Sequence, residues 1–229
     1  MSMPFYVAPE QLMKDKADYA RKGIARGRSL TAVVCAQGIL ITAENPSNTL
    51  HKVSEIYDRI AFAGVGRYNE FDQLRIAGVR HADLKGFAYS REDVDARSLA
   101  NAYAQTVGQI FTHEMKPLEI EILVAEITDT PEDDRLYHVL FDGTVVDENH
   151  YIALGGDAET VRDRLAEVFG DDGQTMHTAL RASVGALAGP DRTLTGDDLE
   201  VAWLDRTVEG RAFRRLSDEE VDEILAGTA

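Results

Sequence analysis

Apolar residues recur along this chain with two different periods, which divide it into predicted strands and predicted helices. Short segments rich in β-branched residues alternate with polar positions or turn residues, a pattern typical of strands. We expect strands at residues 30–34, 39–43, 52–57, 59–64, 119–127, 136–141, 144–146, 151–154, 199–205 and 211–216. Gln37-Gly38 and Asp142-Gly143 predict hairpin turns, and Gly64-Val65-Gly66 predicts a turn after the fourth strand.

Longer segments carry apolar residues every three or four positions, as amphipathic helices do. The helix that starts at Pro9 has a narrow apolar stripe, so we expect it to dock on a surface or a neighbouring subunit. Further helices have ordinary core faces. Their stripes are Phe71, Leu74, Gly78 and Ala82; Leu99, Tyr103, Val107 and Ile110 after an Asp95 cap; Val161, Leu165, Val168 and Phe169 after an Asp157 cap; and Met176, Leu180, Val184 and Leu187.

The elements are grouped in blocks of strands and pairs of helices, which favours an α+β fold with antiparallel sheets over βαβ alternation. Two facing sheets with helices outside each make a four-layer αββα sandwich. At 229 residues the chain is expected to form one domain. Within it we expect an arm at 1–8, a helix and basic elbow at 9–28, the sandwich at 29–216 and a helix at 217–229, capped by Ser217.

Charge and composition restrict the partners of this domain. With 40 acidic and 24 basic residues, the net charge of −16 argues against a nucleic-acid partner. Residues 14–28 are locally basic, which complements a helix C-terminus. The longest uncharged run, residues 29–43, is too short to span a membrane, and no basic leader precedes an apolar run. A cytoplasmic location is therefore expected, and the single cysteine, Cys35, agrees with an intracellular protein.

Few residues carry recognisable chemistry. Cys35 lies among apolar strand residues and is expected in the core rather than as a reactive thiol. The six histidines are scattered with no metal-binding spacing, so neither a metal nor a cofactor is expected. No serine-hydrolase elbow or phosphate-binding loop is present in the sequence.

One catalytic arrangement stays open at the first strand. An N-terminal Ser or Thr can act as a nucleophile with its own amine as base, helped by a lysine and a carboxylate. Ser29 or Thr31 lies near the strand start, and Glu44 and Lys52 would supply the other groups. Neither hydroxyl residue follows the glycine expected at a self-cleaving junction. A self-processing hydrolase and a simple acidic scaffold both remain alternatives.

Long segments in order between Pro4 and Leu216 carry a family resemblance. They are PEQLMKDKADYARKGIARGRS from Pro9, AENPSNTLHKVSEIYDRIAFAGVGRYNEFDQLR from Ala43, ARSLANAYAQTVGQIFTHEMKP from Ala96 and RAFRRL from Arg211. On these segments the chain resembles actinobacterial 20S proteasome α-type subunits. The resemblance implies the αββα fold of N-terminal nucleophile hydrolases, with a retained N-terminal helix and no catalytic residue.

The resemblance also implies partners and sites. Such subunits form heptameric outer rings on rings of β subunits, in an α7β7β7α7 threonine-protease particle that degrades unfolded or tagged proteins, including those marked by a ubiquitin-like modifier. A hexameric AAA ATPase caps the ring. The implied gate residues are Ser2, Met3, Pro4, Phe5, Tyr6, Val7 and Ala8, which lack the Tyr-Asp-Arg motif of archaeal and eukaryotic gates. The implied docking residues for the ATPase C-terminus are Lys52, Arg26 and Arg28.

Overall fold

Two antiparallel five-stranded sheets form the centre of the molecule, which is a computed structural model that describes residues 8–169 and 174–227. The first sheet has the order β10-β9-β2-β1-β8 and the second the order β3-β4-β5-β6-β7. The strands are β1 (Leu30–Cys35), β2 (Gly38–Glu44), β3 (Val53–Tyr57), β4 (Ile60–Gly66), β5 (Ile120–Glu126), β6 (Arg135–Val139), β7 (Val145–Glu148), β8 (Tyr151–Leu154), β9 (Leu199–Asp205) and β10 (Phe213–Arg215).

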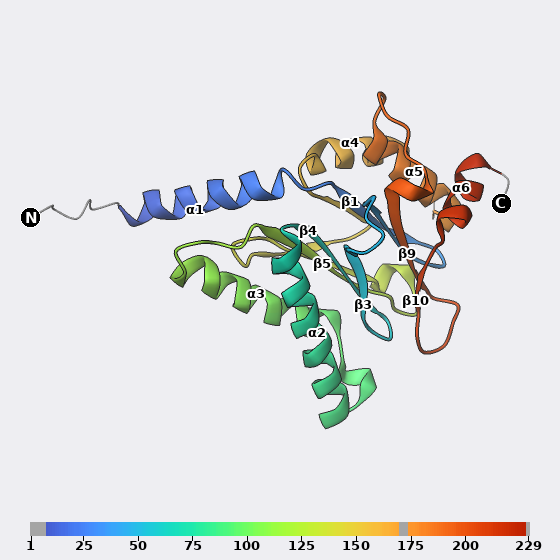
Figure 1. The fold of residues 1–229 in the computed structure, drawn as a ribbon. Coiled ribbons are helices and arrows are strands. Elements are labelled where there is room, and N and C mark those ends of the chain that lie inside the picture. The colour runs from blue at the N-terminus through green and yellow to red at the C-terminus, as the bar shows by residue number, and fades with distance from the viewer. Residues whose placement is uncertain (1–7, 170–173, 228–229) are drawn as a thin grey trace, which may run out of the picture.

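Helices cover the outer face of each sheet, so the predicted four-layer αββα sandwich is confirmed (Figure 1). The α-helices are α1 (Pro9–Ile24), α2 (Tyr68–Ala88), α3 (Ala96–His113), α4 (Ala158–Val168), α5 (Met176–Ala188) and α6 (Asp218–Ala226), with 3-10 helices at Arg91–Asp93, Pro131–Asp133 and Gly196–Asp198. Helices α4, α5 and α6 pack on the first sheet, and α2 and α3 on the second. A third apolar layer lies between the sheets.

The first hairpin confirms the predicted strand pair but corrects its turn. Strands β1 and β2 pair in register from Leu30 opposite Ala43 to Cys35 opposite Gly38, so the turn residues are Ala36 and Gln37. Gly38 belongs to β2, where a Cβ atom would lie 2.4 Å from the Trp203 ring. Its glycine is needed for close packing rather than for a turn.

The prediction of a turn at Gly64-Val65-Gly66 is wrong, because all three residues lie in β4 and pair with β5. A Cβ atom on Gly64 would lie 2.6 Å from the Phe71 ring. Gly66 has a φ of +97°, and its Cβ would lie 2.0 Å from the Glu119 carbonyl oxygen. The strand therefore uses glycine where a side chain and a neighbouring strand approach the backbone.

The helix predictions hold for most core faces. The residues predicted on the α2 stripe are its buried residues, and the Asp95 carboxylate accepts a hydrogen bond from the Ser98 N–H as the cap of α3. Asp157 takes the cap position of α4, although its side chain makes no capping bond. Val168 contradicts the predicted core face: it ends α4 and is 60% exposed.

Helix α1 extends sideways from the sandwich and touches it mainly at its C-terminal end (Figure 1). The buried Lys16 ammonium donates to the Phe111 and Thr112 carbonyl oxygens, at 3.0 and 3.4 Å, near the end of α3. Gly23 lies so close to Glu119 that a Cβ would meet its carboxylate at 2.3 Å. Ala20 and Ile24 are buried in the apolar layer between the sheets. The helix therefore docks on the chain's own sandwich, and its C-terminal part enters the core, contrary to the prediction of surface docking alone.

Candidate functional site

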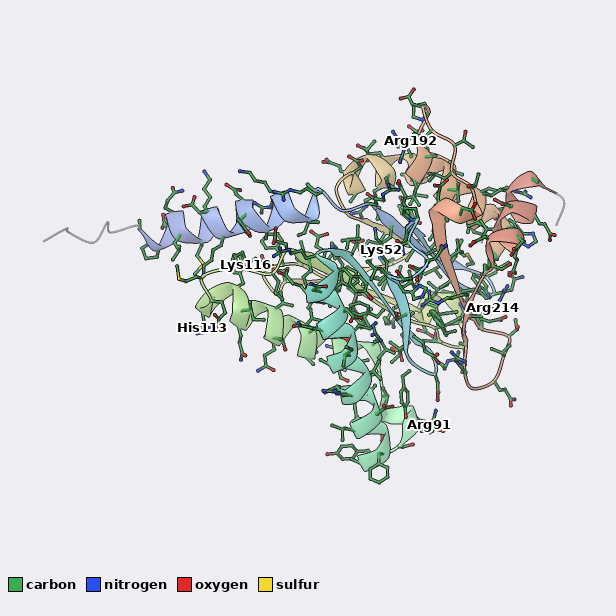
Figure 2. All side chains as sticks on the ribbon, in the orientation of Figure 1. Lys52, Arg91, His113, Lys116, Arg192 and Arg214 are labelled. Atoms are coloured by element: carbon green, nitrogen blue, oxygen red, sulfur yellow. The ribbon has the colours of Figure 1, made fainter. Side chains whose placement is uncertain are left out.

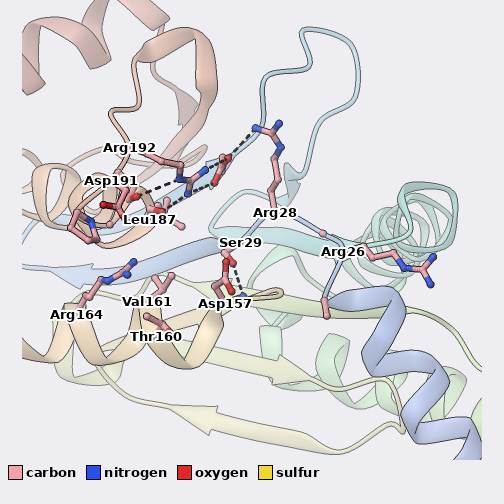
Figure 3. Close-up of a pocket in the computed structure, with 16 residues that line it drawn as sticks. Arg26, Arg28, Ser29, Asp157, Thr160, Val161, Arg164, Leu187, Asp191 and Arg192 are labelled. Carbon is pink, nitrogen blue, oxygen red and sulfur yellow. Dashed lines mark hydrogen bonds and ion pairs between the residues drawn. The ribbon is translucent and has the colours of Figure 1, made fainter.

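The segment between α1 and β1, Ala25–Ser29, borders a pocket of about 590 Å³, which we call the elbow pocket (Figure 3). Its other walls are Glu44 at the end of β2, the N-terminal half of α4, and residues 187–192, which include the last turn of α5 and the segment after it. Four chain regions thus meet at the predicted basic elbow. The charged residues of its lining are Arg26, Arg28, Arg164, Arg192, Glu44, Asp157 and Asp191.

Glu44, at the end of β2, is the electrostatic centre of this pocket. Its side chain is 7% exposed and accepts hydrogen bonds from two guanidinium groups. Arg28 Nη1 donates to Oε1 at 2.9 Å, and Arg192 donates to Oε1 and Oε2 at 2.9 and 3.1 Å. The hydrogen bond and charge of Glu44 raise the pKa of Arg192 above its usual range. Because two half-exposed arginines share one carboxylate, the site retains an excess positive charge.

Lys52, labelled in Figure 2, contacts the segment between α1 and β1 through a backbone atom. Its ammonium donates to the Arg28 carbonyl oxygen at 2.7 Å. Burial lowers the pKa of Lys52 to about 8, with Glu44 and Glu200 raising it and Arg28 lowering it. The structure therefore brings together Lys52 and Arg28, two of the three predicted docking residues, although Lys52 is not among the residues that line the elbow pocket.

Arg26, the third of these residues, is separate from the cluster. Figure 3 shows its side chain pointing away from Arg28 and Arg192. It forms no ion pair within residues 8–169 and 174–227. Arg26 thus lines the pocket without joining the charge network around Glu44.

Most of the predicted gate, from Ser2 to Val7, lies outside the described residues. Ala8 is described: it is exposed, has extended backbone and precedes the first turn of α1. It lies at the end of α1 that is remote from the sandwich (Figure 1). The proposed gate segment is therefore joined to a helix that projects from the sandwich (Figure 1).

The groups required by the hydrolase alternative are present but committed to other bonds. Thr31 is fully buried, and its hydroxyl donates to the Thr42 carbonyl oxygen at 3.5 Å. The Ser29 hydroxyl accepts from the Asp157 N–H at 3.4 Å. The nitrogen of each residue lies in a peptide bond downstream of α1, whereas an N-terminal nucleophile needs a free amine.

Other candidate groups belong to the core or the surface. Cys35 is 1% exposed, and burial raises the pKa of its thiol to about 12, as expected for a core residue. Within the described part of the chain, no three His, Cys, Asp or Glu side chains gather closely enough to hold a metal ion. No helix in residues 8–169 and 174–227 combines the length and apolar character needed to cross a bilayer.

Sequence reasoning missed Arg192 and Arg164, and it considered Glu44 only as a catalytic carboxylate. Arg192 lies 148 positions from Glu44, so no local spacing links them. Glu200 was also missed, although it accepts bonds from the segment that carries Lys52. A charged residue within an otherwise apolar strand was the available signal, since a buried charge needs partners.

Comparisons with known proteins agree with this architecture. A family model described as proteasome subunit matches residues 24–204. The proteasome subunit alpha of Acidimicrobium ferrooxidans is 60% identical over 225 residues, which cover 98% of this chain and 97% of that protein. Those of Kineococcus radiotolerans and Thermomonospora curvata are each 55% identical and cover nearly all of both chains. The chain therefore belongs to the proteasome subunit family, and its relatives at this level of identity are α-type subunits.

Proposed function

We propose that this chain is a non-catalytic α subunit of a cytoplasmic 20S proteasome core particle. In this role it forms heptameric outer rings, gates the entry of unfolded or tagged proteins, and docks an ATPase activator. The observation that carries the proposal is the attachment of α1. Ala20 and Ile24 of the helix are buried in the apolar layer between the sheets, and Lys16 donates to the end of α3, so α1 is packed as part of the fold. A helix retained in this way keeps the nitrogen at the start of β1 in a peptide bond, whereas an N-terminal nucleophile needs a free amine.

Exposed apolar side chains support association with other subunits. Leu84, Phe87 and Tyr89 lie at the end of α2 and are 69%, 93% and 78% exposed. Figure 1 shows that this end projects from the body of the molecule. On α1, Leu12 and Tyr19 are also exposed. Exposed apolar residues clustered at projecting elements are typical of interaction surfaces, which suits neighbouring α subunits and the β subunits of a threonine-type endopeptidase.

The gate is proposed for residues 2–8. They precede the end of α1 that projects from the sandwich (Figure 1). A short arm at the end of a projecting helix can reach the axis of the proposed ring, which the sandwich itself does not have to touch. Removing residues 2–8 should raise the hydrolysis of a small peptide by particles assembled with β subunits. An unchanged rate in fully assembled particles would contradict the gate.

Docking of the ATPase C-terminus is proposed at Lys52, with Arg28 and Arg26 nearby. A flexible ammonium beside a positively charged pocket suits a single terminal carboxylate. Lys52→Ala should abolish the ATPase-stimulated degradation of a protein substrate, with Lys14→Ala, an exposed lysine on α1, as the control. Normal stimulation of the Lys52→Ala particle would remove Lys52 from the docking site.

The experiment that tests the whole proposal combines mass and activity. The chain is purified alone and after co-expression with a β partner, and each sample is measured by intact and native mass spectrometry and by peptide hydrolysis. We expect an unprocessed chain that is inactive alone and active in the co-assembled particle. Loss of about 30 residues up to a Ser or Thr, with activity of the chain alone, would instead favour the hydrolase alternative.

A further inference from the structure

Glu200 is a buried carboxylate in β9 that gathers donors from several parts of the chain. The residue is 8% exposed. Oε2 accepts from the Lys52 N–H at 2.7 Å and from the Asn45 side-chain amide at 2.8 Å. Oε1 accepts from the Val53 N–H at 3.3 Å and from the Arg215 guanidinium, and His51 Nδ1 lies 3.3 Å from it.

These hydrogen bonds hold both ends of the segment between β2 and β3 against the Glu200 side chain. Asn45 begins the segment and Lys52 ends it, and both are held by the same oxygen of Glu200. The Asn45 amide also donates to the Leu50 carbonyl oxygen at 2.7 Å, and its carbonyl oxygen accepts from the Ser47 N–H at 3.3 Å. The backbone of Lys52 is therefore held in place by a buried charge on β9, an interior strand of the first sheet.

We propose that Glu200 is the positioning residue of the docking site: its carboxylate holds residues 45–52 so that the Lys52 ammonium stands at the elbow, ready for a terminal carboxylate. The inference rests on the docking function proposed above. The Lys52 ammonium lies 2.7 Å from the Arg28 carbonyl oxygen, while the Lys52 N–H lies at the same distance from Glu200. Lys52 is thus held at its backbone by Glu200, while its ammonium lies at the elbow. Residues that hold a binding side chain in position in this way affect how tightly the ligand binds.

Glu200 also acts on the charge of Lys52. Burial and Arg28 lower the pKa of Lys52, and the carboxylates of Glu44 and Glu200 raise it. Arg215 and His51 contact Glu200 and complete the charged groups around it. Because removal of the negative charge at Glu200 would lower the pKa of the Lys52 ammonium further, it would shift carboxylate binding to lower pH.

The test measures binding to particles assembled with β subunits. The probe is the fluorescein-labelled C-terminal decapeptide of the organism's proteasomal ATPase, with a free carboxylate or a C-terminal amide. Glu200→Gln should weaken carboxylate binding about tenfold at neutral pH and move its pH midpoint downward. Asn45→Ala, which keeps every charge, should weaken binding with little change in midpoint. Glu55→Gln is the matched control: it removes a carboxylate of β3 that pairs with Arg211, and binding should be unchanged.

The outcomes separate this inference from the docking function. If Lys52→Ala binds the peptide as the parent particle does, the docking function itself is overturned. If Lys52→Ala loses binding while folded Glu200→Gln keeps the parent affinity and midpoint, only the positioning role is overturned. If Glu200→Gln fails to assemble, Asn45→Ala decides: weaker binding supports the role, and parent-like binding overturns it.

Discussion

A buried carboxylate pairs with arginine near each end of the first sheet, but the two ends differ in how many arginines take part and how exposed they are. At one end, Glu44 is shared by Arg28 and Arg192, whose side chains are 51% and 49% exposed in an open pocket. At the other end, the Asp134 carboxylate is fully buried and pairs with Arg206, which is 10% exposed. Arg206 also donates to the carbonyl oxygens of Cys35 and Thr128.

This difference distinguishes an ion pair enclosed by the protein from a charge cluster that borders an open pocket. The closed end, Asp134 with Arg206, has one acid and one base with their bonding capacity used inside the protein. The open end, Glu44 with Arg28 and Arg192, has one acid, two bases and a concave surface, so it retains positive charge that solvent or a ligand can reach. Similar side chains thus serve stability at the closed end and are available for recognition at the open end.

The largest expected effect is at the closed end. Asp134→Ala leaves the Arg206 guanidinium buried without its partner, which should lower the free energy of unfolding by about 3–5 kcal/mol. Urea denaturation of the isolated subunit, followed by circular dichroism, measures this change. A loss below about 1 kcal/mol would place the pair in the class of surface ion pairs and remove the contrast between the two ends.

The next effect uses Cys35 as a reporter of the closed end. Burial raises the pKa of its thiol to about 12, and its carbonyl oxygen lies in the Arg206 network. Alkylation by iodoacetamide at pH 8 should be at least about 100-fold slower in the folded chain than in urea, because the thiolate is the reacting form. Equal rates would show that the closed end opens readily.

A smaller loss is expected when the carboxylate at the open end is neutralised. Glu44→Gln keeps a side chain of the same shape, and the half-exposed arginines can hydrate, so the free energy of unfolding should fall by at most about 1 kcal/mol. The same variant should lower the pKa of Lys52 below its value of about 8, because Glu44 raises it. Side-chain NMR of labelled lysine measures this pKa. A stability loss as large as that of Asp134→Ala would contradict the comparison.

The last prediction concerns the pH dependence contributed by Lys52. Its pKa in the folded chain, about 8, lies below the ordinary 10.5. Between these two values the unfolded chain binds more protons, so stability relative to Lys52→Met should rise with pH across that window. Urea midpoints of both proteins at several pH values measure the trend. A parallel pH dependence in the two proteins would mean that Lys52 titrates normally in the folded chain.

Local patterns predicted a large part of the fold. The hairpin at β1 and β2, the buried stripe of α2 and the Asp95 cap depend on residues close in sequence. Alternation and helical spacing report which side of an element is buried, whatever it packs against. The same local reasoning failed at Gly64 to Gly66, where glycine is required by the Phe71 ring and the neighbouring strand rather than by a turn.

The sequence by itself therefore established the strands, the helices, their layering and, through long matching segments, the family. The charge networks depended on the folded structure. Glu44 meets Arg192 across 148 positions, and Glu200 reaches Lys52 across the same separation. Strand register and helix placement bring such residues together, and an isolated charge in a sequence does not indicate its partner. Lys52 was predicted as a docking residue from the family resemblance, whereas the Glu200 carboxylate that accepts from its N–H is apparent only in the fold.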